Sequence, residues 1–169
     1  MKKCCLVLSG LFITMALFAQ ADSIQAPFKR FPSYPPVRLL LPDSSGYYTK
    51  ADLPKKKSVL VMLFNPDCGH CQLETEQLIA NIDAFKDVQV VMATNTNFAA
   101  MKEFRVKYGL GRFDNIIVGQ DTHYFLPVFY AVHNFPFLAF YNKNKELLSV
   151  FEGSLPIPAM LERFKAKTK

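Results

Sequence analysis

The stretch SVLVMLFNPDCGHCQLETEQL, residues 58–78, decides the fold, because a strand pattern passes directly into a helix pattern within it. Residues 58–64 form an apolar run of strand length, which is typical of a strand covered on both faces of a sheet. From residue 68 to residue 85, the apolar stripe recurs every three or four positions, which predicts a helix. Cys68 and Cys71 stand at the junction of these two elements.

The rest of the chain alternates between strand and helix patterns. Further strands are expected at residues 37–41, 47–49, 88–93, 115–118, 137–141 and 147–151, and further helices at residues 97–108, 122–132 and 157–167. Residues 42–46 have turn chemistry that joins the first two strands into a hairpin, and Gly109 is placed to close a helix in the left-handed conformation. This order predicts an α/β fold with a mixed central β-sheet flanked by helices and an N-terminal extension hairpin.

The amino end has the three-part layout of a secretory signal peptide. Lys2 and Lys3 precede an apolar stretch at residues 4–18, and Ala19-Gln20-Ala21 is a small-x-small cleavage site. The apolar stretch is short for a membrane span. We therefore expect a signal peptide at residues 1–21 and an exported protein, periplasmic or otherwise extracytoplasmic, with no stable membrane span after cleavage. Retention of this segment as an anchor is the alternative.

The chain beyond the signal divides into an arm and one domain. Four prolines between residues 22 and 36 predict an extended N-terminal arm over residues 22–35, and residues 36–169 suit one domain. Cleavage would remove two lysines and no acidic residue, lowering the formal net charge from +6 to +4. No basic stripe interleaved with aromatic residues is present, so we expect no binding to nucleic acid. We also expect a monomer.

The position of Cys68 favours a reactive thiol. Reactive groups in an α/β sheet gather at the carboxyl ends of strands, where Cys68 begins the following helix. Unpaired backbone amides and the helix dipole at that point stabilise an anion, so we expect the thiolate of Cys68 to be favoured. Cys71, one helical turn later, is within the distance that a disulfide tolerates. The pair can therefore open and close with little movement of the backbone.

Three neighbours modify this chemistry. His70, as a cation or hydrogen-bond donor, would stabilise the thiolate of Cys68 further and make the disulfide more oxidising, whereas the carboxylate of Asp67 would act in the opposite direction. Glu74 lies on the core-facing stripe one turn beyond Cys71. Partly buried there, it could exchange a proton with the thiol of Cys71; alternatively, it points to solvent and merely suits the helix dipole.

Three interpretations of the cysteine pair compete. A structural disulfide is common in secreted proteins, but so short a loop constrains little chain entropy. A zinc site needs four ligands, and only His123 and His133 remain besides His70. A redox-active dithiol is favoured over both, and we expect neither a metal nor a cofactor.

These features together resemble the thioredoxin superfamily and, within it, the secreted TlpA-like (ResA-like) thiol-disulfide oxidoreductases. The resemblance covers about residues 35–167. Its specific elements are the tetrapeptide Cys68-Gly69-His70-Cys71, Glu74 three residues after the second cysteine, the lead-in ADLPKKKSVLVMLF from residue 51, and Pro136 at the start of the late hairpin.

The resemblance implies a thioredoxin-like fold in which Pro136 is a cis-proline packed beside the cysteines. In this family that proline places a backbone edge against the substrate, so Pro136 and Phe135, with Gly69 and Asp67 at the start of the helix, are the expected substrate-binding residues. Cys68, Cys71, Glu74 and His70 are the expected catalytic residues. The implied partners are protein thiols and disulfides and an upstream thiol electron donor, and net reduction is the family default.

The sequence departs from the family pattern near the cysteines. Asp67 replaces the usual tryptophan, Met62 stands where thioredoxins bury an aspartate, and Phe137 follows the expected cis-proline in place of threonine. A disulfide oxidase or isomerase is therefore an alternative, supported by His70. A non-catalytic thioredoxin-fold module that binds a partner or handles a metal is another, supported by Asp67 and the aromatic segment 124–141.

Overall fold

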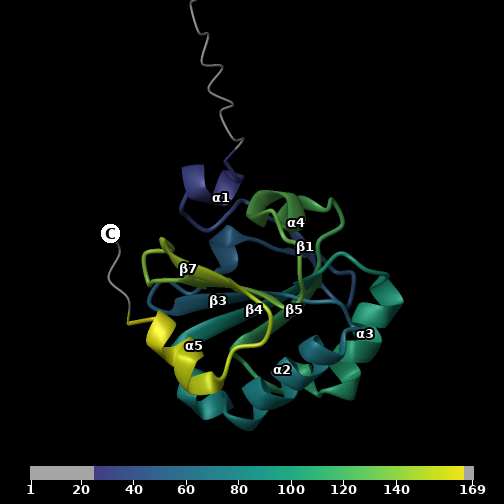
Figure 1. Cartoon of the computed structure of the whole chain (residues 1–169). Helices are drawn as coiled ribbons and strands as arrows, with labels where there is room; N and C mark the ends of the chain where they lie inside the picture. Colours follow the sequence, from purple (N-terminus) through teal and green to yellow (C-terminus); the bar gives the residue numbers. More distant parts are fainter. Residues whose placement is uncertain (1–24, 166–169) are drawn as a thin grey trace, which may run out of the picture.

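A seven-stranded mixed sheet, in the order β2-β1-β5-β4-β3-β6-β7, forms the centre of the computed structural model (Figure 1). The structure describes residues 25–165, and the expected signal peptide lies outside them. The strands are β1 (Leu39–Leu40), β2 (Tyr47–Tyr48), β3 (Ser58–Leu63), β4 (Val88–Thr94), β5 (Ile116–Gln120), β6 (Phe137–Tyr141) and β7 (Leu147–Glu152). The α-helices are α1 (Pro27–Arg30), α2 (Gly69–Ala80), α3 (Phe98–Lys107), α4 (Phe125–Tyr130) and α5 (Ile157–Arg163), with short 3₁₀ turns at Lys50–Asp52 (η1), Ile82–Phe85 (η2) and Leu110–Arg112 (η3).

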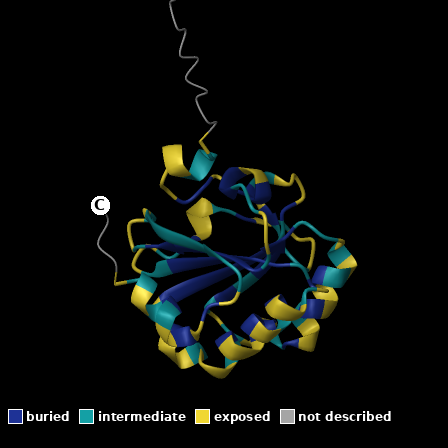
Figure 2. Ribbon diagram, in the orientation of Figure 1, coloured by how far each residue is buried: buried dark blue, intermediate teal, exposed yellow. Residues whose placement is uncertain are grey.

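The strand pairing confirms the predicted mixed sheet. β3, β4 and β5 are parallel neighbours, β6 and β7 continue the sheet as an antiparallel pair beside β3, and β1 adds antiparallel to β5. All of β4 and all of β3 except Ser58 are buried, as their largely apolar sequences predict. Figure 2 shows these buried strands between helices whose outer faces are exposed.

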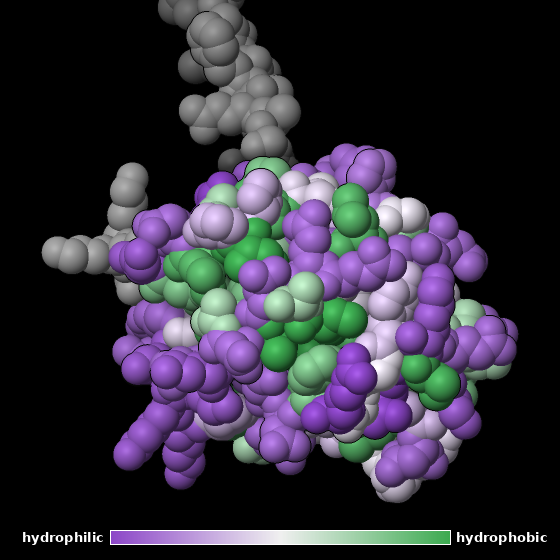
Figure 3. All heavy atoms as spheres, turned by 90° about the horizontal axis from the view of Figure 1, so that it is seen from below, coloured by the Kyte–Doolittle hydropathy of each residue, from purple (hydrophilic) through white to green (hydrophobic). Residues whose placement is uncertain are grey.

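Alternate side chains of β3 pack into two separate hydrophobic cores. Leu60 and Met62 belong to the cluster beneath α2, α3 and α5, whereas Val59 and Val61 belong to the cluster on the other face, near α1 and α4. This is the period of two that a strand imposes on its side chains. Figure 1 shows the two sets of helices on opposite faces of the sheet, and Figure 3 shows the lower face, where hydrophilic side chains surround smaller hydrophobic patches.

The amino-terminal arm differs in part from the extended segment predicted for residues 22–35. Pro27 begins the single turn of α1, a position that suits its fixed φ. Phe28 packs against the ring of Tyr130 at 6.0 Å between centroids, and Tyr34 meets Tyr141 edge-on at 5.5 Å. Aromatic burial therefore holds this arm on the domain.

Three helices are shorter than their sequence patterns predict. The helix expected at residues 157–167 ends at Arg163. The helix expected at residues 68–85 divides at Asn81 into α2 and η2. The helix expected at residues 122–132 covers only α4, because Tyr124 has a left-handed backbone (φ 54°) and the Asp121 carboxylate accepts the backbone N–H of Leu126 at 2.7 Å. Gly109 does close α3 in the left-handed conformation, as predicted.

Within residues 25–165, no helix is long and apolar enough to cross a membrane.

Gly119 in β5 allows the N-terminal hairpin to approach the sheet. A methyl group added there would lie 2.7 Å from Leu39 Cβ and 3.2 Å from the backbone oxygen of Leu40. Because neither atom can rotate away, Gly119→Ala should displace β1 and lower the free energy of unfolding by about 1–3 kcal/mol in urea denaturation. Gly46→Ala, with no atom within 4 Å of the new methyl, is the control. Equal losses for both variants would contradict this account.

Candidate active site

Cys68 caps the amino end of α2. Its backbone is extended, and its Sγ accepts the backbone N–H of Cys71 at 3.4 Å. The preceding loop is held by Asn65, whose backbone oxygen accepts the N–H of Cys68 at 3.0 Å and whose side-chain oxygen accepts the N–H of Asp67 at 2.9 Å. The thiol of Cys68 therefore stands at the start of the helix, where the sequence predicted it.

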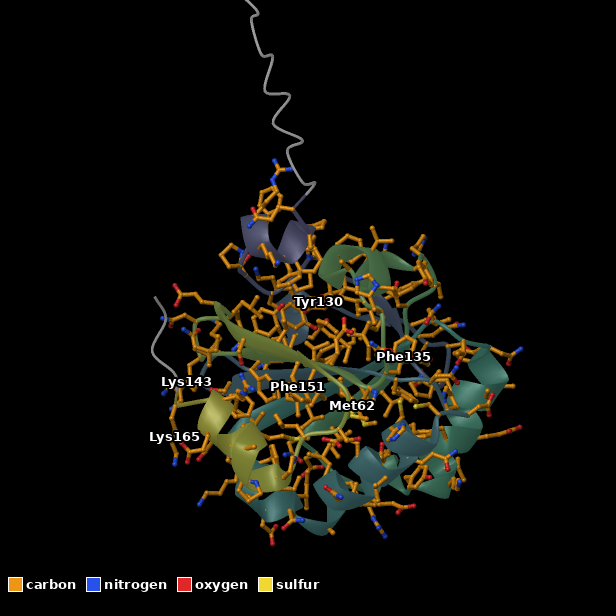
Figure 4. The ribbon with its side chains drawn as sticks, viewed as in Figure 1. Met62, Tyr130, Phe135, Lys143, Phe151 and Lys165 are labelled. Atoms are coloured by element: carbon orange, nitrogen blue, oxygen red, sulfur yellow. The ribbon has the colours of Figure 1, made fainter. Side chains whose placement is uncertain are left out.

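The loop before β6 lies against the first cysteine. The peptide bond between Phe135 and Pro136 is cis, as the resemblance implied. The Cys68 thiol lies 3.7 Å from the backbone oxygen of Phe135, in a geometry that lets the thiol donate. Leu63 at the end of β3 is opposite Phe137 at the start of β6, which brings the two loops to one edge of the sheet. Figure 4 shows Phe135 at that edge.

The two cysteines differ in exposure. Both are free thiols, but Cys68 is partly exposed whereas Cys71 is fully buried. Burial raises the pKa of the Cys71 thiol well above its usual range, and backbone hydrogen bonding from Asn65 opposes that shift only in part. The outer thiol is accessible to a large partner, and the inner one is accessible only to its neighbours in the protein.

Glu74 is buried, which decides between the two alternatives that the sequence left open. Its side chain is 0 % exposed, and both carboxyl oxygens lie 3.2 Å from the backbone N–H of Leu155. Burial raises the pKa of this carboxyl, although the N–H of Leu155 and the hydroxyl of Ser154 partly counteract it. The carboxylate also contributes to the raised pKa of Cys71, so the two groups influence each other electrostatically.

The segment between β7 and α5 was not singled out by sequence reasoning. Besides the contact of Leu155 with Glu74, the hydroxyl of Ser154 donates to the backbone oxygen of His70 at 3.4 Å. Gly153, with φ 99°, begins the segment and donates its N–H to the backbone oxygen of Pro136 at 2.7 Å. A glycine directly after a strand was the available signal for a turn, but nothing local indicates its partners.

The remaining predicted residues lie on the surface around the start of α2. Asp67, Gly69 and His70 are exposed, and a methyl group at Gly69 would meet no atom within 4 Å. His133 is also exposed, and its backbone N–H donates to the Glu152 carboxylate at 3.2 Å. Across residues 25–165, no group of three or more His, Cys, Asp or Glu side chains is arranged to hold a metal ion.

Replacement of Glu74 should change how stability depends on pH. Because its folded-state pKa is raised, the stability that Glu74 contributes is present below its unfolded pKa of about 4.3 and is lost as pH rises through the folded value. Glu74→Gln removes this titration. As pH rises, the free energy of unfolding of the Glu74→Gln variant should therefore increase relative to that of the natural protein. The increase is about 1.4 kcal/mol for each unit by which folding raises the pKa of Glu74.

Urea denaturation between about pH 4 and pH 8 measures this difference. Glu76→Gln is the matched control, because it makes the same substitution on the same helix at an exposed position. The same pH dependence for both variants would show that burial of Glu74 is not the cause.

Comparison with known proteins gives structural likeness only. No protein-family model matches this sequence. No curated protein matches it either. A secreted Mycobacterium tuberculosis disulfide oxidoreductase homologous to E. coli DsbE superposes with a TM-score of 0.64 at 20% identity, covering 78% of this chain and 96% of that one.

Two further structures are similar. StoA from Bacillus subtilis has a TM-score of 0.60 at 17% identity, with 78% of this chain and 98% of that chain covered. The pneumococcal exposed lipoprotein thioredoxin Etrx1 from Streptococcus pneumoniae has a TM-score of 0.58 at 23% identity, with 76% and 96% covered. The mixed sheet, the helix that begins at the cysteine pair and these likenesses show that the chain has the thioredoxin-like fold.

Proposed function

We propose that this protein is an extracytoplasmic thiol-disulfide oxidoreductase that exchanges disulfides with other proteins, with net reduction of its substrates. One observation carries the proposal: a partly exposed free thiol, Cys68, caps a helix beside cis-Pro136 and accepts a hydrogen bond from the backbone of the buried Cys71. A structural relative is described as a disulfide oxidoreductase, which supports the same chemistry here.

The proposed reaction proceeds through a mixed disulfide. The thiolate of Cys68 attacks one sulfur of a substrate disulfide, the substrate S–S bond breaks, and the released sulfur takes up a proton. Cys71 then loses its proton and attacks Cys68 Sγ. This step releases the second substrate thiol and leaves a disulfide between Cys68 and Cys71. Two electrons have passed to the substrate, and an upstream thiol donor restores the dithiol.

Glu74 is the proposed proton acceptor for the second step. Cys71 must be deprotonated to attack, yet burial raises its pKa and disfavours the thiolate. Glu74 lies one helical turn further along α2 and is buried with a raised pKa of its own, so it can take a proton from its surroundings and return it. Its bond to Leu155 holds the carboxyl group in place.

The substrate is proposed to approach over the exposed start of α2. Cys68 is reached between the loop that carries Phe135 and Pro136 and the surface formed by Asp67, Gly69 and His70. The absence of a side chain at Gly69 leaves space for the substrate backbone, since an added methyl group there meets no atom. Asp67 and His70 would then contact residues that flank the substrate cysteine.

Export is supported by the amino end of the sequence and by the relatives. The layout of residues 1–21 is that of a signal peptide, and its removal leaves Cys68 and Cys71 as the two cysteines of the chain. One structural relative is described as secreted and another as an exposed lipoprotein.

Single cysteine variants test the reaction. Cys71→Ala should accumulate a stable mixed disulfide with a disulfide-containing substrate such as insulin, because the resolving thiol is gone. Cys68→Ala should form almost none, since Cys71 is buried, and both variants should lose dithiothreitol-driven insulin reduction. Mass spectrometry under non-reducing conditions detects the adduct, and thermal unfolding checks that both variants fold. Turnover by Cys68→Ala would refute the proposal, whereas binding of a partner or a metal by that variant with unchanged affinity would favour a binding module.

The reduction potential of the couple tests the direction of electron flow. For a reductase, we expect a value near the about −270 mV of thioredoxin, measured by equilibration with thiol buffers and trapping of free thiols. A value between about −120 and −180 mV would instead assign an oxidase or isomerase, with His70 as a contributor to the oxidising potential. A pair that resists reduction in the native protein would be a structural disulfide.

A further inference from the structure

An apolar groove lies between the amino-terminal arm and α4, away from the cysteine pair. It encloses about 550 Å³ and is lined mainly by aromatic and proline residues, among them Phe31, Tyr34, Pro35, Phe125 and Phe129. Phe31 is 60% exposed, and Tyr124, which caps α4, and Val128, within α4, are 55% and 62% exposed. Lys50 is the one charged residue among those that line the groove.

A second hollow, of about 340 Å³, is lined by four lysines and no acidic residue. They are Lys50, Lys55, Lys143 and Lys145. The ammonium group of Lys145 is occupied by the backbone oxygens of Pro54, Lys57 and Lys143, so this lysine has a structural role. The described part of the chain contains one salt bridge, between Lys165 and Glu162. The other three lysines in the hollow therefore form no direct ion pair with a carboxylate of the described residues.

Lys50 lines both hollows, which makes them parts of one surface. We call this the lysine-groove surface: the apolar groove and, next to it, the hollow formed by Lys50, Lys55 and Lys143. Its two parts match the two parts of an amphiphile with an apolar tail and an anionic head. Basic residues combined with exposed aromatic residues are also the pattern by which proteins bind anionic membrane surfaces.

The topology separates this surface from the redox site. Lys55 precedes β3 and Lys143 follows β6, whereas Cys68 follows β3 and Phe135 precedes β6. The length of these two strands therefore separates the lysines from the thiols, and Figure 4 shows Lys143 and Phe135 on opposite sides of the ribbon. The described chain also begins next to the groove, at α1, directly after the segment that carries the apolar residues 4–18.

We propose that the lysine-groove surface docks on an anionic membrane. Lys50, Lys55 and Lys143 contact the headgroups of anionic phospholipids, and the groove with the exposed ring of Phe31 accepts apolar lipid. The opposite end of the sheet, with Cys68, then faces away from the bilayer towards protein substrates. This docking is independent of the redox reaction, so either can fail without the other.

A single tryptophan can report the docking, because the natural chain contains none. Phe31→Trp places the fluorophore at the groove. The protein is purified after export, with its amino end as processed by the cell. It is titrated with vesicles of phosphatidylcholine alone or mixed with phosphatidylglycerol. We expect a blue shift of the emission with the anionic vesicles, weakening with added salt, and a much smaller one with neutral vesicles.

Charge-reversal variants in this background locate the binding surface. Replacing Lys50, Lys55 and Lys143 by glutamate should raise the lipid concentration for half-maximal shift at least about 10-fold. The control replaces Lys86, Lys102 and Lys107, exposed lysines elsewhere, by glutamate and makes the same change in net charge. It should bind nearly as well as the parent, and both variants should keep insulin reduction.

Three results would overturn the proposal. Equal weakening by both triple variants would show that net charge, and no particular surface, attracts the vesicles. Equal binding to neutral vesicles would exclude a role for the lysines. Failure to bind vesicles, together with a response to inorganic phosphate or to polyglutamate that depends on Lys50, Lys55 and Lys143, would assign the surface to a soluble anion or to an acidic protein.

Discussion

The antiparallel pairing of β3 with β6 is the constraint on which the candidate site depends. Leu63 lies opposite Phe137, so the loop that leaves β3 and the loop that enters β6 meet at one edge of the sheet. Cys68 lies at the end of the first loop, and cis-Pro136 lies in the second. β3 is also paired with β4 on its other side, and a slip of one residue would exchange its two buried faces. The position of the thiol is thus fixed by the register of the central strands.

Several parts of the structure followed from local sequence. β3 and β4 could be predicted because strands covered on both faces are largely apolar. The placement of Cys68 followed from the change from strand to helix periodicity at residue 68. The burial of Glu74 could not be decided in this way, since the N–H that it accepts belongs to Leu155, far along the chain. The turn of α1 depends likewise on packing against Tyr130, which no local pattern reveals.

The candidate site places two ionisable groups in an apolar surrounding. Cys71 and Glu74 belong to one helix and are both fully buried, where charge on either is unfavourable. The folded protein therefore favours the neutral forms, while the proposed second step needs a transient thiolate. A backbone N–H directed at Glu74 lessens the cost of a negative charge there without neutralising it. Stability at neutral pH and readiness for proton transfer are thus opposing demands on the same two side chains.

The hydrogen bond from Leu155 to Glu74 connects the chemistry with the far end of the chain. Leu155 lies two residues before α5, and its neighbour Ser154 contacts the backbone of His70 between the cysteines. The carboxyl-terminal helix is therefore attached to α2 at two points that flank Cys71. A change in the charge of Glu74 would alter the hydrogen bond from Leu155 and, with it, the attachment of the segment that leads into α5.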